Sequence, residues 1–359
     1  MKFPQNRRHK KRFAIFASIF ILSFMLVASI FIPIPYFIEM PGSAEDVQQF
    51  VRVDGKSNDQ TGAYLLTTVG IRQATPATFL LAKKDTFQEV IPERDFLGDN
   101  TSEEHELLGE LQMSSSENMA KKVALDLAGE TYHFSYKGIY VMDVMATSDF
   151  RGKLAVGDLV YQVDDLSFET TEEFMDYVAS KELGETITLK IERDGEKKTI
   201  SGKLTKLSEE NPVGVGITLT EHTELVSDRE ITFEVEGIGG PSAGLMFTLE
   251  IYESLTGQSL RKGHVIAGTG EIRSDGKVGM IGGIDKKVVA ADRAGAEIFF
   301  APDESYSKEV LDKYPDLKNN YQQALAAAKK INTKMEIVPV KTVQDALEYM
   351  ESLNYKDSE

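Results

Sequence analysis

The first hydrophobic feature of the chain is an uninterrupted apolar segment close to its beginning. Residues 13–32, FAIFASIFILSFMLVASIFI, carry no charge. A helix of this length spans about 30 Å, the thickness of the hydrocarbon layer of a membrane. Pro33 and Pro35 end the apolar segment, and Tyr36 stands at the expected membrane interface. The pattern predicts an uncleaved transmembrane anchor over 13–35. A cleaved signal peptide is the alternative, although its apolar region is usually only about 7–15 residues long.

From residue 36 to residue 130, short apolar runs alternate with polar stretches. This N-terminal segment predicts two strands, an exposed acidic loop, and a helix that begins at a capping box and ends at a glycine. The expected elements are strands at 62–71 and 78–82, the loop at 98–110, and a helix that follows Ser114-Ser115-Ser116-Glu117 and ends before Gly129.

Residues 131–208 show the alternation of polar and apolar positions that is typical of β-strands. The expected elements are a strand pair over 134–144 broken by Gly138, a helix from Thr170 or Thr171 to Ser180, and a β-hairpin over 185–204 turning at Asp194-Gly195. This order, together with Leu154, Gly157 and Asp158, resembles a PDZ domain.

In PDZ domains, a glycine-containing loop donates backbone N–H groups to the terminal carboxylate of a peptide, which adds a strand to the sheet. The resemblance implies that Gly138, Ile139, Tyr140 and Val141 bind a peptide in a PDZ groove. Tyr140 stands where the family has its second glycine. The alternative is a β-rich spacer in which Ile139 and Val141 are simply core residues.

Residues 212–355 alternate strands with helices, which is typical of α/β or α+β domains. Strands are expected at 231–235, 297–302 and 335–340, and a strand that leads into a turn at 264–272. Helices are expected at 242–255, 284–296, 321–331 and from the cap Thr342 to Leu353. For the whole chain the sequence predicts an α+β fold that contains a transmembrane helix, a PDZ-like β-rich domain and an α/β domain.

The charge distribution indicates orientation and excludes one class of partner. The chain has 40 basic and 57 acidic residues and a net charge of −17. The first twelve residues contain no acid and six bases, so residues 1–12 are predicted to be a cytoplasmic tail, with the body facing outward. The acidic body argues against nucleic acid as a partner, because duplex binding needs a basic surface. The chain has 0 cysteines, which excludes disulfides and thiolate nucleophiles.

Nucleotide and metal motifs are absent from the sequence. A P-loop requires GxxxxGK[ST], but Gly276-Lys277 is followed by Val278. The 5 histidines lack the paired spacing of zinc ligands. We therefore expect no ATP binding, no metal site and no cofactor.

The remaining candidate chemistry is a serine and a lysine. Gly239-Gly240-Pro241-Ser242-Ala243-Gly244 places Ser242 at the start of a predicted helix, where the backbone N–H groups of Gly240 and Ser242 are candidate oxyanion donors. A helix N-cap is the alternative role for this serine. Lys287 precedes the apolar stretch Val288 to Ala291. If that lysine is buried, its pKa falls and the neutral amine can accept the serine proton; a surface lysine in the first helical turn is the alternative.

Both clusters resemble the proteolytic domain of Lon proteases, whose serine lies in a GPSAG motif and whose lysine lies in a later GG-Φ-x-x-K motif. The resemblance implies that Ser242 is the nucleophile and Lys287 the base; the register of the motif selects Lys287 over Lys286. It also implies that Thr269 helps to orient the lysine, whereas a buried strand-end hydroxyl is the alternative role for that threonine. Gly239 stands where Lon proteases usually carry an aspartate. The sequence shows no AAA+ ATPase module, so we expect cleavage without ATP.

The order of anchor, PDZ-like domain and Lon-type domain resembles the Lon-like PDZ proteases of Gram-positive bacteria, in particular the SepM-type pheromone-processing serine proteases. This implies a membrane-anchored extracellular endopeptidase that trims a secreted signalling peptide. One rival is a PDZ-based peptide-binding scaffold with an inactive Lon-like domain. A second is a Ser-His-Asp hydrolase that uses His264 or His222.

The helix expected at 116–128 resembles the one that precedes the serine-bearing strand in Lon-type domains. We therefore expect residues 40–128 to supply the first strands and helix of the Lon-type domain, with the PDZ-like domain inserted into it. The alternative is three domains in series, over 36–130, 131–208 and 212–355.

Overall fold

The computed structural model describes the whole chain except residues 1–6, 99, 208–212, 236 and 357–359. The described chain forms two compact units. One consists of residues up to 42 together with 69–99, and the other of residues 43–68 together with 100–359.

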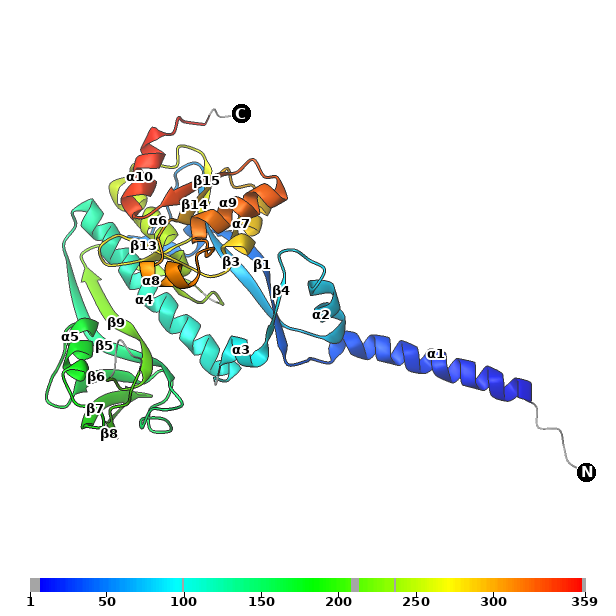
Figure 1. The fold of residues 1–359 in the computed structure, drawn as a ribbon. Coiled ribbons are helices and arrows are strands. Elements are labelled where there is room, and N and C mark those ends of the chain that lie inside the picture. Colours follow the sequence, from blue (N-terminus) through cyan, green and yellow to red (C-terminus); the bar gives the residue numbers. More distant parts are fainter. Residues whose placement is uncertain (1–6, 99, 208–212, 236, 357–359) are drawn as a thin grey trace, which may run out of the picture. The chain divides into compact units, whose positions relative to one another are not determined.

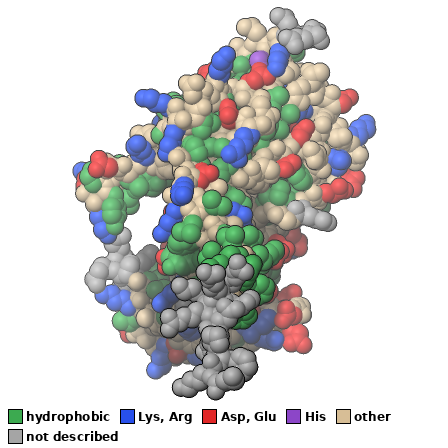
Figure 2. All heavy atoms as spheres, turned by 90° about the vertical axis from the view of Figure 1, so that its right-hand side faces the viewer, with side chains coloured by type: hydrophobic (Ala, Val, Ile, Leu, Met, Phe, Trp, Pro, Cys, Tyr) green, Lys and Arg blue, Asp and Glu red, His purple; other side chains and the backbone are tan. Residues whose placement is uncertain are grey.

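The first unit begins with the apolar helix α1 (Arg7–Phe31). Its segment Phe13–Phe31 has a mean hydropathy of 2.5, and none of it is buried inside the protein. Phe13 and Phe20 are 77% and 73% exposed. Figure 2 shows hydrophobic side chains gathered on the face of the molecule turned toward the viewer. The described chain thus has one helix that is long and apolar enough to cross a membrane.

The rest of the first unit contains a β-pair and two short helices. Strand β1 (Tyr36–Asp46) pairs antiparallel with β4 (Glu89–Pro92), and the helices are α2 (Pro76–Ala82) and α3 (Glu93–Leu97). The strand predicted at 78–82 is wrong, because these residues belong to α2. Thr75 and Thr78 form a capping box, and Pro76 occupies the first turn, where its missing N–H costs nothing. These local signals outweigh the strand propensity of the apolar run.

The second unit contains a parallel sheet in the order β15-β14-β11-β3. β3 spans Ala63–Gln73, β11 Val265–Gly268, β14 Ile298–Pro302 and β15 Glu336–Val340. The associated helices are α4 (Ser102–Ala128), α6 (Gly244–Thr256), α7 (Ile284–Arg293), α8 (Lys308–Lys313), α9 (Asn320–Ile331) and α10 (Val343–Ser352). Two small strand pairings complete this part: β2 (Val51–Val53) pairs with β10 (Ile231–Phe233), and β12 (Glu271–Ile272) pairs with β13 (Val278–Gly279). The short helix η1 (Val47–Gln49) precedes β2.

Helix α4 is longer than the sequence predicts. The prediction of an exposed loop over 98–110 is wrong, because the helix already begins at Ser102. Thr101 and Glu104 form the capping box that starts it, so the signal at Ser114 lies inside the helix. Gly129 ends the helix in the left-handed conformation, with φ 71°, as predicted.

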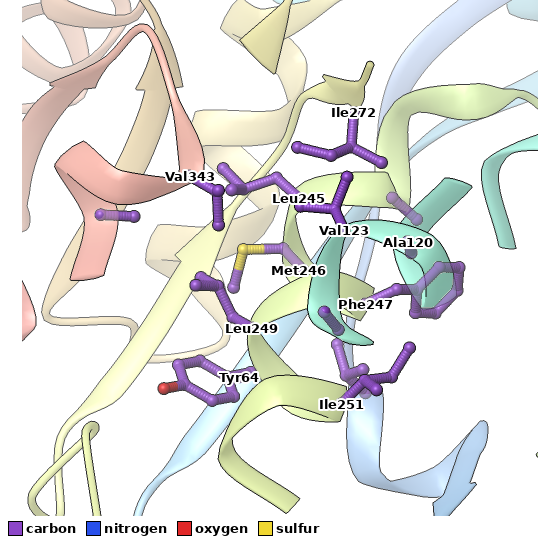
Figure 3. Close-up of a cluster of buried hydrophobic side chains, with 14 of the residues drawn as sticks. Tyr64, Ala120, Val123, Leu245, Met246, Phe247, Leu249, Ile251, Ile272 and Val343 are labelled. Atoms are coloured by element: carbon purple, nitrogen blue, oxygen red, sulfur yellow. The ribbon is translucent and has the colours of Figure 1, made fainter. Parts of the chain in front are cut away.

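The main core lies around α6 and α4. Figure 3 shows three residues of α6 packed against residues of α4 and β3. The α6 residues are Leu245, Met246 and Phe247, and their neighbours include Val123 of α4 and Tyr64 of β3. This core also includes residues of β2, β10, β14, β15 and α10. Residues from before position 129 and from after position 230 therefore share one core.

The chain between these two parts forms a second sheet with its own core, in the order β8-β7-β6-β5-β9. Its elements, green in Figure 1, are β5 (Tyr132–Val144), β6 (Leu159–Val163), α5 (Thr171–Ala179), β7 (Thr186–Arg193), β8 (Glu196–Lys203) and β9 (Ile217–Ser227). Helix α5 and the hairpin turn at Asp194-Gly195 are confirmed; both turn residues have positive φ, which suits the twist of a two-residue hairpin.

Two features of this sheet differ from the prediction. The expected strand pair over 134–144 is a single strand, β5, because Gly138 produces a register shift rather than a turn. Strand β9 pairs along the length of β5, so the sheet continues beyond the boundary expected at 208. This pairing joins residues far apart in the sequence, so the residues of β9 alone do not predict it.

Candidate active site

Ser242 lies in a tight turn that leads into α6. The turn is the short helix η2 (Pro241–Ala243), and Gly240 enters it with φ 88°, a conformation that favours glycine. Ala243, not Ser242, occupies the N-cap position of α6, and no side chain caps that helix. The serine hydroxyl is thus not used as a cap. A Cβ at Gly244 would lie 2.8 Å from Ile272 Cγ2, so glycine lets the turn approach β12 closely.

Lys287 reaches the serine from the first turn of α7. Gly283 precedes the helix in the left-handed conformation, with φ 64°. The Lys287 Nζ lies 2.6 Å from the Ser242 Oγ and 3.1 Å from the Thr269 Oγ1. The neighbouring Lys286 instead lies 3.5 Å from a carboxylate oxygen of Asp285. The geometry therefore selects Lys287 as the partner of the serine.

Burial decides the charge of Lys287. The residue is 4% exposed, and no carboxylate of the described residues pairs with its amine. Removing an ammonium group from water without a counter-ion disfavours its charged form. Burial accordingly lowers the pKa of Lys287 from 10.5 to about 7. Close to neutral pH, a large fraction of this lysine is a neutral amine that can accept a proton.

Thr269 connects the two residues. Its hydroxyl donates to the Ser242 carbonyl oxygen at 3.0 Å and accepts from the Lys287 Nζ. Thr269 is fully buried at the end of β11. One side chain thus holds both the backbone of the serine turn and the amine.

Helix α4 supports the serine turn, a contribution that the motifs do not reveal. The Ser116 Oγ donates to the Pro241 carbonyl at 3.0 Å, and the Gly240 N–H donates to the Gly109 carbonyl at 2.9 Å. Gly239 packs against Gly109, and a Cβ on Gly239 would lie 3.0 Å from the Gly109 Cα. A side chain at position 239, such as the aspartate that Lon proteases usually carry there, would require the Gly109 backbone to shift by a few tenths of an ångström.

The contact with Gly109 also changes the oxyanion prediction. Because the Gly240 N–H is engaged by α4, it does not point to a free acceptor site in this structure. No backbone acceptor among the described residues binds the Ser242 N–H. Of the two predicted donors, Ser242 is therefore the one that the geometry leaves available.

The two candidate histidines have other partners. The His264 Nδ1 lies 2.7 Å from Glu297 Oε2, and its Nε2 lies 3.1 Å from the Asn354 carbonyl. The His222 ring packs against the Tyr140 ring, with centroids 4.7 Å apart and the ring planes tilted by 45°. Neither hydrogen-bonds Ser242, so the arrangement does not favour a Ser-His-Asp hydrolase.

The predicted peptide-binding residues lie inside the PDZ-type sheet. Gly138, Ile139, Tyr140 and Val141 belong to β5, which has β6 on one side and β9 on the other. Ile139 and Val141 are fully buried. The prediction that these residues form an open binding loop is contradicted here, because the chain's own β9 occupies the edge to which a peptide would add.

Comparisons with known proteins match two parts of the chain to known families. Residues 236–351 match the Lon protease (S16) C-terminal proteolytic domain, and residues 108–204 match the PDZ domain. The α+β fold thus contains a PDZ domain and a Lon-type proteolytic domain, and the latter indicates a serine protease.

Individual relatives cover parts of the chain. The Lon protease of Ureaplasma parvum is 37% identical over 127 residues, which are 31% of this chain and 16% of that protein. The Lon protease of Desulforamulus reducens is 36% identical over 129 residues, 33% of this chain and 15% of that protein. The matches therefore span less than a fifth of these Lon proteases. The crystal structure of the PDZ domain of an SdrC-like protein from Listeria monocytogenes is 33% identical and covers 24% of this chain and 90% of that one, with a TM-score of 0.23.

Proposed function

We propose that the protein is a membrane-anchored serine endopeptidase that cleaves secreted peptides without ATP, with Ser242 as nucleophile and Lys287 as general base. The observation that carries this proposal is the 2.6 Å separation between the Lys287 Nζ and the Ser242 Oγ, at a lysine whose burial lowers its pKa to about 7. A buried amine that is neutral close to working pH is what a serine nucleophile needs as a base.

The reaction follows from these contacts. Neutral Lys287 accepts the hydroxyl proton as the Ser242 Oγ attacks the carbonyl carbon of the scissile bond. The Ser242 N–H donates to the oxygen on which negative charge develops. The C–N bond breaks, the ammonium of Lys287 gives its proton to the leaving amine, and an acyl-enzyme remains. A water molecule then gives a proton to Lys287 and its oxygen bonds to the acyl carbon. The ester bond to the Ser242 Oγ breaks, and the Lys287 ammonium returns the proton to that oxygen, which restores the serine.

Thr269 acts as a positioning residue for this pair. We expect Thr269→Val to lower kcat about tenfold with little change in KM, because the variant keeps the volume but loses the hydroxyl that holds the Lys287 amine and the Ser242 carbonyl. Thr269→Ser is the matched control and should recover most of the rate. Steady-state kinetics on one peptide substrate checks this; a change confined to KM would contradict the positioning role.

The location proposed for this activity is outside the cell membrane. Helix α1 supports a single membrane crossing, and the six basic residues before the apolar segment support a cytoplasmic N-terminus. The combination of an anchor, a PDZ domain and a Lon-type domain supports a role like that of SepM-type proteases, which trim signalling pheromones.

The proposed function is tested by offering secreted peptides to the full chain in lipid nanodiscs and reading the products by mass spectrometry. We expect discrete internal cleavages, unchanged by ATP. The rival is a peptide-binding scaffold with an inactive proteolytic domain. It predicts binding with no products, and that outcome would overturn the proposal.

A further inference from the structure

We propose that helix α2 is a second membrane contact, whose exposed leucines enter the surface of the same bilayer that α1 crosses. The partner is a phospholipid surface, at the level where the headgroups meet the acyl chains. The inference rests on the membrane anchoring in the proposed function. It concerns only the first compact unit, which contains both helices.

Helix α2 has one packed face and one bare face. Phe79 packs against the Tyr36 ring with centroids 5.0 Å apart, and Ala82 is fully buried in the same small core as Ile38. Residues three apart share a face of a helix, so this inward pair leaves the two positions between them outside. Those positions are Leu80 and Leu81, which are 65% and 66% exposed. Two adjacent large apolar side chains therefore face away from the unit.

The place of α2 at the end of α1 indicates what covers this face. The two helices contact each other, and Figure 1 shows α2 beside the end of α1 that leads into the body. The Ile34 N–H donates to the Ala74 carbonyl at 2.8 Å, and the Ala74 N–H donates to the Tyr36 carbonyl at 2.7 Å. These bonds hold the start of α2 against the segment that follows the apolar helix. When α1 spans the hydrocarbon layer, α2 therefore lies where that layer ends.

Two lysines follow the leucines. Lys83 and Lys84 come directly after the last residue of α2, and the Lys83 Nζ lies 4.5 Å from the centroid of the Phe79 ring. Apolar side chains beside ammonium groups are typical of helices that lie in a membrane interface, because the lysines reach the phosphates while the leucines enter the acyl region. The next residue, Asp85, accepts a hydrogen bond from the Phe87 N–H at 2.8 Å, within its own turn.

The backbone at both ends of α2 is capped. The Thr75 N–H donates to the Thr78 Oγ1 at 2.8 Å, and the Thr78 N–H donates to the Thr75 Oγ1 at 3.3 Å. Pro76 has no N–H to satisfy in the first turn. At the other end, the Lys84 N–H donates to the Leu81 carbonyl at 3.0 Å. Because lipid supplies no hydrogen-bond partners, a helix whose polar groups are paired internally enters it at the lowest cost.

A second attachment has a mechanical consequence for the first unit. The hydrogen bonds of α1 stop at Ile32, whose N–H donates to the Ala28 carbonyl, because Pro33 follows. The helix is thus not continuous with β1, and a continuous backbone does not fix its tilt. Leucines of α2 in the membrane surface fix the orientation of the unit instead.

The experiment uses the fact that the chain has 0 tryptophans, so that one introduced tryptophan reports its own surroundings. Leu81→Trp places the probe at the proposed contact. Phe20→Trp places it within the apolar segment of α1, and Leu183→Trp places it at an exposed leucine between α5 and β7. Each full-length variant is reconstituted at one chain per nanodisc of phosphatidylcholine and phosphatidylglycerol. The discs carry nitroxide lipids labelled either just below the headgroup or at the end of the acyl chain.

We expect the shallow nitroxide to lower the Leu81→Trp emission about twofold, and the deep one to lower it less, because an interfacial helix enters only about 5–10 Å. The emission should also be blue-shifted. Phe20→Trp should show the reverse order of quenching, and Leu183→Trp should be quenched by neither lipid. Leu80→Glu, added to Leu81→Trp, replaces an exposed side chain with a charge and should remove the quenching.

Each outcome decides the question. Unquenched Leu81→Trp emission, together with a quenched Phe20→Trp, overturns the contact and leaves the anchor intact. A blue shift without quenching means that protein covers the leucines, which also overturns the proposal. So does quenching that is equal at Leu183, or that survives Leu80→Glu. If the deep nitroxide does not quench Phe20→Trp, the proposed membrane anchoring fails, and the inference fails with it.

Discussion

Ser242→Ala and Lys287→Ala should each lower peptide cleavage by at least about 10⁴-fold, with the fold retained. The two side chains act as one unit, so removing either should cost nearly as much as removing both. Their 2.6 Å contact is the basis of this expectation, because no histidine or carboxylate of the described residues replaces Lys287 at the Ser242 hydroxyl. Cleavage of a fluorogenic peptide by the single and double variants, with circular dichroism as the check on folding, measures the effect.

Lys286→Ala is the matched control for the lysine. Lys286 adjoins Lys287 in α7 and is also buried, but it lies beside Asp285 rather than the serine. Its variant should retain cleavage. An active Lys287→Ala chain, or loss of cleavage only in Lys286→Ala, would contradict the assignment of the base.

Lys287→Met should stabilise the fold at neutral pH by up to about 5 kcal/mol, because it replaces a buried amine with an apolar side chain of similar length. The figure corresponds to a pKa lowered by burial from 10.5 to about 7, at about 1.4 kcal/mol for each unit. The parent protein would thus be less stable than it could be, and the unfavourable burial of the lysine is what makes it a base.

The stabilisation by Lys287→Met should depend on pH. Between pH 7 and 10.5 the unfolded chain holds the Lys287 proton more often than the folded chain does, so the stability of the parent protein rises with pH across this window. Below pH 7 the full cost of burial is present. The advantage of Lys287→Met should therefore be largest at or below pH 7 and fade toward pH 10.5. Urea unfolding followed by circular dichroism measures it; an advantage independent of pH would mean that Lys287 does not titrate as described.

Local signals account for much of what could be predicted. Thr342 caps α10 as expected, and Asp194-Gly195 turns the β7–β8 hairpin. The GPSAG and GG-Φ-x-x-K motifs identify Ser242 and Lys287 because the glycines before each residue allow the backbone conformations that the site requires. Such features depend on a few neighbouring residues, and the sequence records them directly.

What could not be predicted depends on contacts between distant parts of the chain. The bond from the Gly240 N–H to the Gly109 carbonyl requires α4 to lie against the serine turn, and no motif contains both glycines. The pairing of β9 with β5 likewise fills the peptide edge of the PDZ-type sheet, although Gly138 to Val141 look like a binding loop in the sequence. The strand prediction at 78–82 is wrong for a different reason. The apolar residues there suit a strand, but the capping box at Thr75 starts helix α2 instead.

The proposed function depends on the activation of Ser242 by a neutral Lys287. The rate at which a β-lactone acylates the full chain, followed by mass spectrometry between pH 5 and 9, tests it directly. We expect one adduct, on Ser242, that forms faster as the pH rises through about 7, where Lys287 loses its proton, and that Lys287→Met abolishes. An adduct on another residue, or a rate on Ser242 that is independent of pH and unchanged in Lys287→Met, would contradict it.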